Sequence, residues 1–134
     1  MDEATTLPIP PQPTLETHRA EDFRAVYSNH VVVNSSAWDL TLTFSRFVEV
    51  DGKSGVEQEV TATIPFGLAK LATYWMEAQI IANEIETGRR VSMRESLYPP
   101  PVPDLTPEQE KIPFFVKYRE EMERLRERFI ASLS

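Results

Sequence analysis

The chain of 134 residues contains no cysteine. Without thiols it cannot form disulfides, thiolate zinc sites or iron–sulfur clusters, and it has no cysteine nucleophile. Its two histidines, His18 and His30, have no second metal ligand at a typical spacing. No apolar run approaches the roughly 20 residues that span a bilayer. We therefore expect no metal, no cofactor and no membrane partner, and we predict that the protein is not an enzyme.

Positive charge is also scarce. The chain has 14 lysines and arginines and 21 aspartates and glutamates, which gives a net charge of −7. A negative surface disfavours nucleic acids and anionic membranes. Arg89, Arg90 and Arg94 form the best local exception, and they leave a nucleic-acid accessory role as a less favoured alternative. The N-terminus is acidic and rich in proline rather than signal-like, so the cytoplasm is the expected location.

The 11 prolines are concentrated in two runs, one before residue 14 and one between residues 99 and 103. Proline interrupts helices and central strands because it lacks a backbone donor. The predicted organisation is an extended or disordered tail, a core domain, a proline-rich linker and a C-terminal helical segment, at residues 1–22, 23–93, 94–105 and 106–134. A core of about 70 residues is only marginally stable alone, which favours oligomerisation.

Three segments alternate apolar and polar residues as strands do: "RAVYSNHVVVN", "DLTLTFSRFVEV" and "VEQEVTATI". In the second segment Leu40 and Phe44 share one face, but the phase breaks at Phe47, which indicates a bulge or a Phe47 exposed to a partner. The third segment places its apolar residues on one face, namely Val56, Val60, Ala62 and Ile64. The short connection "DGKSG" predicts a hairpin, and the three strands predict an antiparallel meander.

Residues 66–88 predict one long helix, with Pro65 suited to its start and Gly88 to its end. A short fourth strand around Val91 would follow it. The fold class is therefore α+β: an antiparallel β-meander of three to four strands is packed by one long helix, and a C-terminal amphipathic helix follows on the proline-rich linker.

This long helix carries apolar residues on two faces. The broader face is expected to cover the sheet and consists of Leu68, Leu71, Tyr74, Trp75, Ala78, Ala82 and Ile85. A narrow stripe of Ala69, Met76 and Ile80, bordered by Thr73, lies nearly opposite. Either a second copy or the C-terminal helix could cover the stripe. We favour a second copy, which makes Ala69, Thr73, Met76 and Ile80 the predicted interface of a homodimer or higher oligomer.

The C-terminal segment opens on "TPEQ", which has the form of a capping box at Thr106–Gln109. Pro113 then separates a single turn from a helix of residues 114–132. Apolar residues recur along it at heptad spacing: Phe115, Tyr118, Met122, Leu125 and Phe129. We expect this stripe to dock on a partner or on a neighbouring subunit, and whether it docks in cis or in trans stays open.

Four short motifs give the chain a resemblance to known proteins: "YSN" at residue 27, the spacing of Asp39, Leu42 and Phe44, Pro65 followed by Ala69-Lys70, and Glu84 followed by Gly88. In this order they resemble a family of small uncharacterised bacterial proteins, a domain of unknown function. The resemblance covers about half of the chain and implies no activity or catalytic residue. At the level of the fold, a meander followed by a long helix is similar to SecB-like chaperones, which assemble as dimers and tetramers and bind unfolded clients.

The preferred interpretation is a non-catalytic, homo-oligomeric protein-binding or scaffold module. The alternative is a SecB-like chaperone or peptide-binding protein, in which Phe47, Trp38 and Met76 would contact the client. The proline-rich segments could serve as ligands for another protein, although a stiff spacer is the favoured role.

Overall fold

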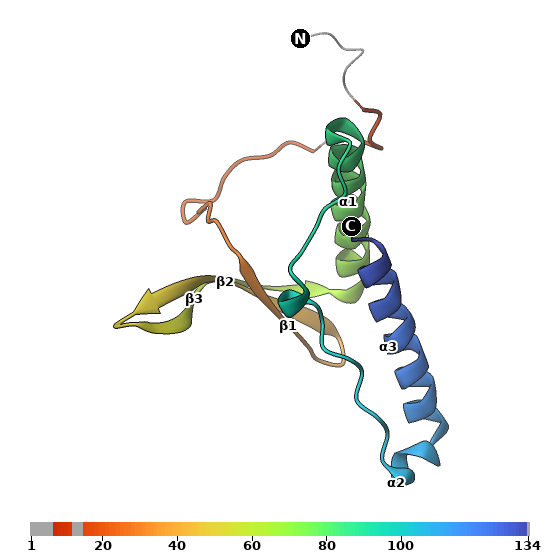
Figure 1. Ribbon diagram of the computed structural model, residues 1–134. Coiled ribbons are helices and arrows are strands. Elements are labelled where there is room, and N and C mark those ends of the chain that lie inside the picture. The colour runs from red at the N-terminus through yellow and green to blue at the C-terminus, as the bar shows by residue number, and fades with distance from the viewer. Residues whose placement is uncertain (1–6, 12–14, 134) are drawn as a thin grey trace. The chain divides into compact units, whose positions relative to one another are not determined.

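The computed structural model describes residues 7–11 and 15–133 of the chain (Figure 1). Part of the predicted N-terminal tail, residues 1–6 and 12–14, lies outside the described residues. The elements in chain order are β1 (His30–Ser35), β2 (Asp39–Val50), β3 (Lys53–Pro65), α1 (Phe66–Thr87), the 3₁₀ turn η2 (Glu95–Leu97), α2 (Pro107–Glu110) and α3 (Pro113–Ala131). The predicted α+β fold class is confirmed, with three strands, a long helix after them, and a C-terminal helix after a short linker.

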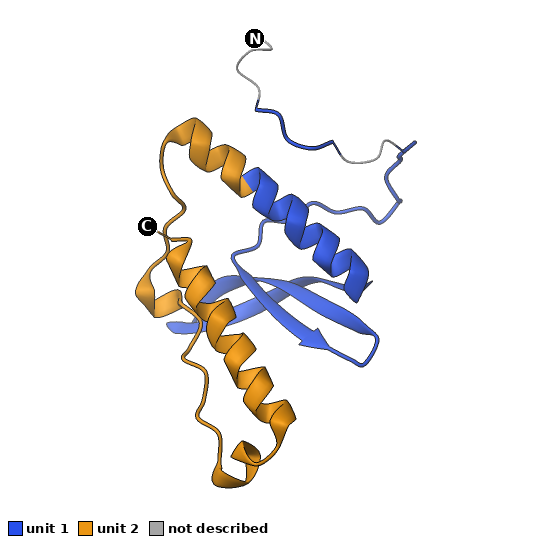
Figure 2. Ribbon diagram, turned by 90° about the vertical axis from the view of Figure 1, so that its right-hand side faces the viewer, with its two compact units in different colours: residues 1–79 blue, residues 80–134 orange. Residues whose placement is uncertain are grey.

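The chain divides into two compact units, residues 1–79 and residues 80–134, and the division falls inside α1 (Figure 2). The first unit contains the sheet and most of α1. The second contains the last turns of α1, η2, α2 and α3. None of the helices in the described ranges is long and apolar enough to cross a membrane.

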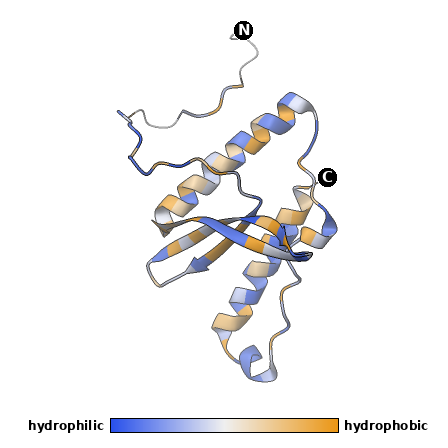
Figure 3. Ribbon diagram, turned by 90° about the vertical axis from the view of Figure 1, so that its left-hand side faces the viewer, coloured by the Kyte–Doolittle hydropathy of each residue, from blue (hydrophilic) through white to orange (hydrophobic). Residues whose placement is uncertain are grey.

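The three strands form one antiparallel sheet in the order β1-β2-β3. Leu42, in the central strand, lies opposite Val33 of β1 and Ala62 of β3, so their side chains share one face. The other face pairs threonines, with the hydroxyls of Thr41 and Thr63 3.0 Å apart. Apolar and polar residues accordingly alternate along the strands, as Figure 3 shows. The alternation predicted for these segments is confirmed.

A β-bulge interrupts this pattern. The register of β2 and β3 shifts between Phe44 and Ser45, which leaves Glu59 of β3 without a direct partner. Beyond the shift, Phe47 lies opposite Val56. Strict alternation predicts Val56 on the same face as the other apolar residues of β3, and this placement is wrong. The extra residue reverses the phase, so Val56 shares the opposite face with Phe47.

Strand β1 begins at His30, later than the sequence predicts. In the preceding segment "YSN", the side chains of Ser28 and Asn29 bond to the backbone of β2. The Oγ atom of Ser28 lies 2.7 Å from the carbonyl oxygen of Ser45 and accepts the backbone N–H of Ser45 at 3.1 Å. The Oδ1 atom of Asn29 accepts the backbone N–H of Phe47 at 2.9 Å. These two side chains therefore fasten the start of β1 to the part of β2 that lies beside the bulge of β3. Ser45 beneath them is only 1% exposed.

The β2–β3 hairpin turns at Asp51 and Gly52, whose φ angles are 51° and 74°. Two successive positive φ angles are those of a type I′ turn, which matches the right-handed twist of the flanking strands. Aspartate tolerates this conformation and glycine adopts it without strain. The hairpin predicted from "DGKSG" is confirmed.

The ends of α1 follow the predicted signals to within one residue. Pro65 ends β3 and immediately precedes the helix, and Gly88 follows its last residue with a φ of 67°. The fourth strand expected around Val91 does not form; residues 89–94 have no regular secondary structure, and the N–H of Val91 donates to Glu84 Oε2 at 2.8 Å. The sheet therefore has three strands in the described part of the chain.

The broad face of α1 is less buried than its composition predicts. Its centre is partly covered at Trp75 and Ala78 and buried at Ala82. The large residues flanking this centre stay about half exposed, namely Leu68, Leu71, Tyr74 and Ile85. Among the described residues Ala82 is the one apolar side chain in the buried class. The expectation that the broad face forms the core of its own subunit is therefore wrong for these four flanking side chains.

The second unit confirms the predicted capping box. The Oγ1 atom of Thr106 accepts the N–H of Gln109 at 3.3 Å, and Gln109 Oε1 accepts the N–H of Thr106 at 3.0 Å. Pro107 is the first residue of α2 and Pro113 the first of α3. Because proline has no N–H, each begins its helix at a position that needs no donor.

Candidate protein-docking surface

The apolar stripe of α3 faces the proline-rich segment of its own unit. Together they line a groove of about 540 Å³ whose lining includes Pro99–Pro103 on one side and Tyr118, Met122, Leu125 and Phe129 on the other. Four of the five residues predicted to dock on a partner therefore meet in one place. The fifth, Phe115, lines an adjoining pocket of about 290 Å³ together with Leu105 and Tyr118. Residues Pro99–Pro103, which the sequence predicts to be a linker, therefore partly cover the apolar stripe of α3 in the same chain.

Two arginines of α3 hold this segment. The Nε atom of Arg126 donates to the carbonyl oxygen of Pro99 at 3.0 Å, and the Nε atom of Arg119 donates to that of Pro103 at 3.1 Å. Seven helical residues rise about 10.5 Å. Four residues of extended proline-rich chain rise about 12 Å. The two spacings agree, so both arginines can reach a carbonyl on one extended run, which we call the proline strap (Pro99–Pro103).

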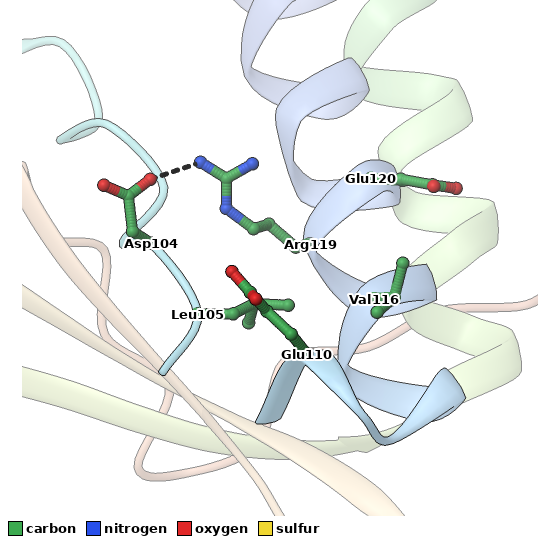
Figure 4. A pocket seen from close by; sticks show the side chains of 6 residues that line it. All are labelled: Asp104, Leu105, Glu110, Val116, Arg119 and Glu120. Carbon is green, nitrogen blue, oxygen red and sulfur yellow. Dashed lines mark hydrogen bonds and ion pairs between the residues drawn. The ribbon is translucent and has the colours of Figure 1, made fainter. Parts of the chain in front are cut away.

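Beside the strap, Arg119 is the centre of an ionic cluster. Its Nη2 atom lies 2.8 Å from Asp104 Oδ1, and its Nη1 atom pairs with Glu123 one turn along α3. Figure 4 shows the Asp104–Arg119 contact at the edge of a pocket of about 460 Å³ that Glu110 and Glu120 also line. Carboxylates outnumber the single guanidinium here, so this end of the surface favours a cationic or polar neighbour.

The solvent side of α3 carries further ion pairs. Glu121 lies 2.9 Å from Lys117 Nζ and 3.1 Å from Arg124 Nη1. The hydrogen bond and the charge of Lys117 lower the pKa of the Glu121 carboxyl, and Arg124 lowers it further. A lowered pKa means that these pairs stabilise α3 above the ordinary pKa of glutamate and are lost as the pH falls through the folded-state pKa.

The sequence does not single out Arg119 and Arg126, although a signal for them exists. Each directly follows a residue of the apolar stripe, Tyr118 and Leu125, and the two are seven residues apart on the helix. A proline-rich run has carbonyl acceptors but few donors of its own. Paired arginines beside an apolar stripe can therefore indicate that such a run docks there rather than acting as a free spacer.

The residues predicted for self-association lie together on one side of α1. Ala69 and Thr73 are linked by a hydrogen bond from Thr73 Oγ1 to the Ala69 carbonyl oxygen at 2.9 Å. Met76 and Ile80 follow at helical spacing and are 57% and 46% exposed. At this exposure the side chains of Met76 and Ile80 are available for contact with another surface.

A second exposed cluster lies on the sheet, beyond the bulge. The rings of His30 and Phe47 are 5.1 Å apart in an edge-to-face arrangement, and Val56 lies opposite Phe47. Phe47 was expected as an exposed contact, and it is about half exposed. Val56 could not be placed beside it from the sequence because the bulge sets its face, and His30 reaches it through the register of β1 on β2. Trp38 is 84% exposed in the turn between β1 and β2, where the Ser36 hydroxyl accepts its N–H at 3.1 Å.

Of the three arginines considered for a nucleic-acid accessory role, Arg89 and Arg90 line one pocket of about 490 Å³. Arg90 donates from Nη1 to the carbonyl oxygen of Ala131 at 3.4 Å. Within residues 7–11 and 15–133, no group of three or more histidine, aspartate or glutamate side chains is placed to hold a metal ion. The described surfaces therefore offer apolar contact, with charged side chains at their borders.

One prediction concerns the proline strap. Replacing Arg119 and Arg126 together with alanine removes both hydrogen bonds to the strap carbonyls. Each such bond contributes about 1 kcal/mol. Losing both should therefore lower the ratio of docked to free strap by roughly 30-fold. Nuclear Overhauser contacts between the prolines and the Met122 methyl group measure docking. The double variant Arg124→Ala, Arg128→Ala removes the same charge from α3 and should keep those contacts; their persistence in both variants would refute the role of the two arginines.

Comparison of the chain with protein-family models, with curated proteins and with solved structures finds no match.

Proposed function

We propose that the chain is a non-catalytic, homo-oligomeric protein-binding or scaffold module. The observation that carries this proposal is the exposure of apolar side chains in both units. Met76 and Ile80 on α1 are 57% and 46% exposed and Leu125 on α3 is about half exposed, while Ala82 is the only apolar residue of the described chain that is buried.

Such exposure is costly for a small protein. Full burial of a leucine or isoleucine side chain stabilises a fold by about 1.5–3 kcal/mol, and half burial forfeits much of it. Ordering each residue of the backbone costs about 1–2 kcal/mol. A second copy packed on Met76 and Ile80 would add apolar burial that the isolated chain lacks, and binding to the folded form stabilises it by mass action.

The interface that we propose for self-association is the stripe of α1 formed by Ala69, Thr73, Met76 and Ile80. Its four residues are uncharged, and Lys70 and Glu77 border them on one side. On a chain of net charge −7, an uncharged centre limits the repulsion between identical copies. The groove between the proline strap and α3 is then the surface for another protein, because its apolar lining is framed by the ionic groups of Arg119.

Sedimentation velocity over a concentration series tests the proposal. We expect a dimer or larger species whose population grows with concentration. A strict monomer at every concentration, with no partner retained by the immobilised chain, would contradict it. Where a partner is retained, genomic neighbours or a pull-down would identify it.

A second function, chaperone-like binding of extended peptides, is favoured by exposed aromatic residues of the sheet and of its β1–β2 turn. Trp38, and Phe47 beside His30, offer stacking surfaces that an unfolded client could use. This function agrees with the fold-level similarity to SecB-like chaperones, and like the resemblance to the small bacterial family it stays a prediction. Failure to slow the aggregation of any unfolded client would count against it.

A further inference from the structure

Strand β1 is an open edge of the sheet. It pairs only with β2 in the described part of the chain, so its outer backbone donors and acceptors have no strand partner. Its sequence is HVVVNS, and Val31, Val32 and Val33 are 50%, 38% and 54% exposed. Natural edge strands are protected by lysine, proline, bulges or inward charges, because an unprotected edge pairs with other strands. The edge of β1 has none of these devices.

The other edge of the sheet is protected. Strand β3 carries Lys53, Glu57 and Glu59, ends in Pro65 and contains the bulge. At the bulge, Arg24 donates a hydrogen bond to the carbonyl oxygen of Glu59, and Arg46 Nη2 lies 3.3 Å from the Glu59 carboxylate. The contrast between the two edges indicates that pairing is prevented at β3 and permitted at β1.

We propose that β1 pairs antiparallel with β1 of a second copy about a two-fold axis. The two three-stranded sheets then become one continuous six-stranded sheet. The proposal rests on the self-association proposed above and adds to it a second surface, the sheet edge.

The side chains of β1 select the register. Val31 lies opposite Phe44 and Val33 opposite Leu42, so both valines share the apolar face of the sheet. If Val32 lies on the two-fold axis opposite itself, Val31 of each copy faces Val33 of the other, and each valine meets a valine on its own face. A shift by one residue would mix the two faces, which disfavours it strongly. Centring on Val33 keeps the faces but sets Val31 opposite Ser35, with less apolar contact.

Charge favours a second copy as the occupant of this edge. With histidine neutral, no residue of β1 is charged, so two copies can meet there although the chain carries −7. Three consecutive β-branched residues also favour the extended conformation that pairing requires. An unrelated peptide gains the backbone bonds, but a copy of β1 also supplies a valine opposite each of Val31, Val32 and Val33.

The chain has no cysteine, so a single introduced thiol reports its own contacts. In Val32→Cys the two thiols face each other across the axis, where directly opposite Cβ atoms are about 4.5–5.5 Å apart. This separation is close to that of a disulfide. In Val31→Cys each thiol lies opposite Val33 of the other copy, so the two introduced thiols are two positions apart along the strands. We expect Val32→Cys to form a cross-linked dimer about ten times faster under mild oxidation than Val31→Cys.

Gln58→Cys, an exposed position on the protected edge, is the control for random collision. Val32→Lys provides an independent measurement, since it sets two like charges against each other on the axis and should weaken association, whereas Gln58→Lys should not. Equal cross-linking at positions 32 and 58, or none at 32 in a protein that sediments as a dimer, would overturn the β1 pairing while leaving self-association in place. A monomer in sedimentation would instead remove both.

Discussion

The double variant Met76→Glu, Ile80→Glu is expected to lose the contact through the α1 stripe and to sediment as a smaller species than the unaltered chain at the same concentration. Both side chains are about half exposed on the α1 stripe, so the isolated copy gains two solvated charges and keeps its fold. Glutamate has nearly the helix propensity of methionine. In the dimer, each copy would bury unpaired like charges, which costs about 3–5 kcal/mol. The dissociation constant should therefore rise by about 100-fold or more.

The matched control adds the same charge elsewhere. Ser54→Glu, Gln58→Glu places two glutamates at exposed positions of β3, away from α1. This variant has the same net charge as the first, so general repulsion between copies is equal in both. If both variants dissociate alike, charge alone is responsible and the stripe is not the interface. If neither dissociates, another surface joins the copies.

The second large effect is expected at the hairpin. Gly52→Val should lower the free energy of unfolding by about 2 kcal/mol, because a β-branched residue is strained at a φ of 74°. Asp51 already holds a positive φ, so the turn cannot relax at its neighbour. A urea titration followed by circular dichroism measures the change, and the midpoint should fall.

Gly55→Ala is the control for this prediction. Gly55 lies in β3 without a positive φ, and a Cβ built there meets nothing within 4 Å. Alanine at this position should be neutral or stabilise the fold by up to about 1 kcal/mol, because it restricts the unfolded chain. Equal midpoints for Gly52→Val and Gly55→Ala would show that the turn conformation does not limit stability.

The local structure could be predicted from the sequence because local interactions decide it. The hairpin depends on Asp51-Gly52, the start of α2 on Thr106 and Gln109, and the end of α1 on Gly88, and each signal lies within a few residues of its effect. Alternation along β2 likewise depends only on neighbouring residues.

What could not be predicted depends on contacts between distant residues. Val56 changes face because a bulge near Glu59 shifts the register, and alternation specifies a phase but not its interruptions. The helical wheel of α1 identifies Leu68 and Leu71 as one apolar face, but it does not say how much of that face the chain itself covers. The domain boundaries at residues 93 and 105 stay predictions, as does the identity of any partner.

The strap on α3 has a consequence for the way its groove can open. Pro99, Pro100, Pro101 and Pro103 have no N–H, so none of them can donate to a strand ladder. The strap is held by two arginine hydrogen bonds and apolar contacts, with the Asp104–Arg119 pair beside it, and breaking them would not unwind α3. Once free, it also cannot donate to an exposed sheet edge at those positions. The apolar stripe can thus be uncovered for a partner while the released segment stays a poor seed for aggregation.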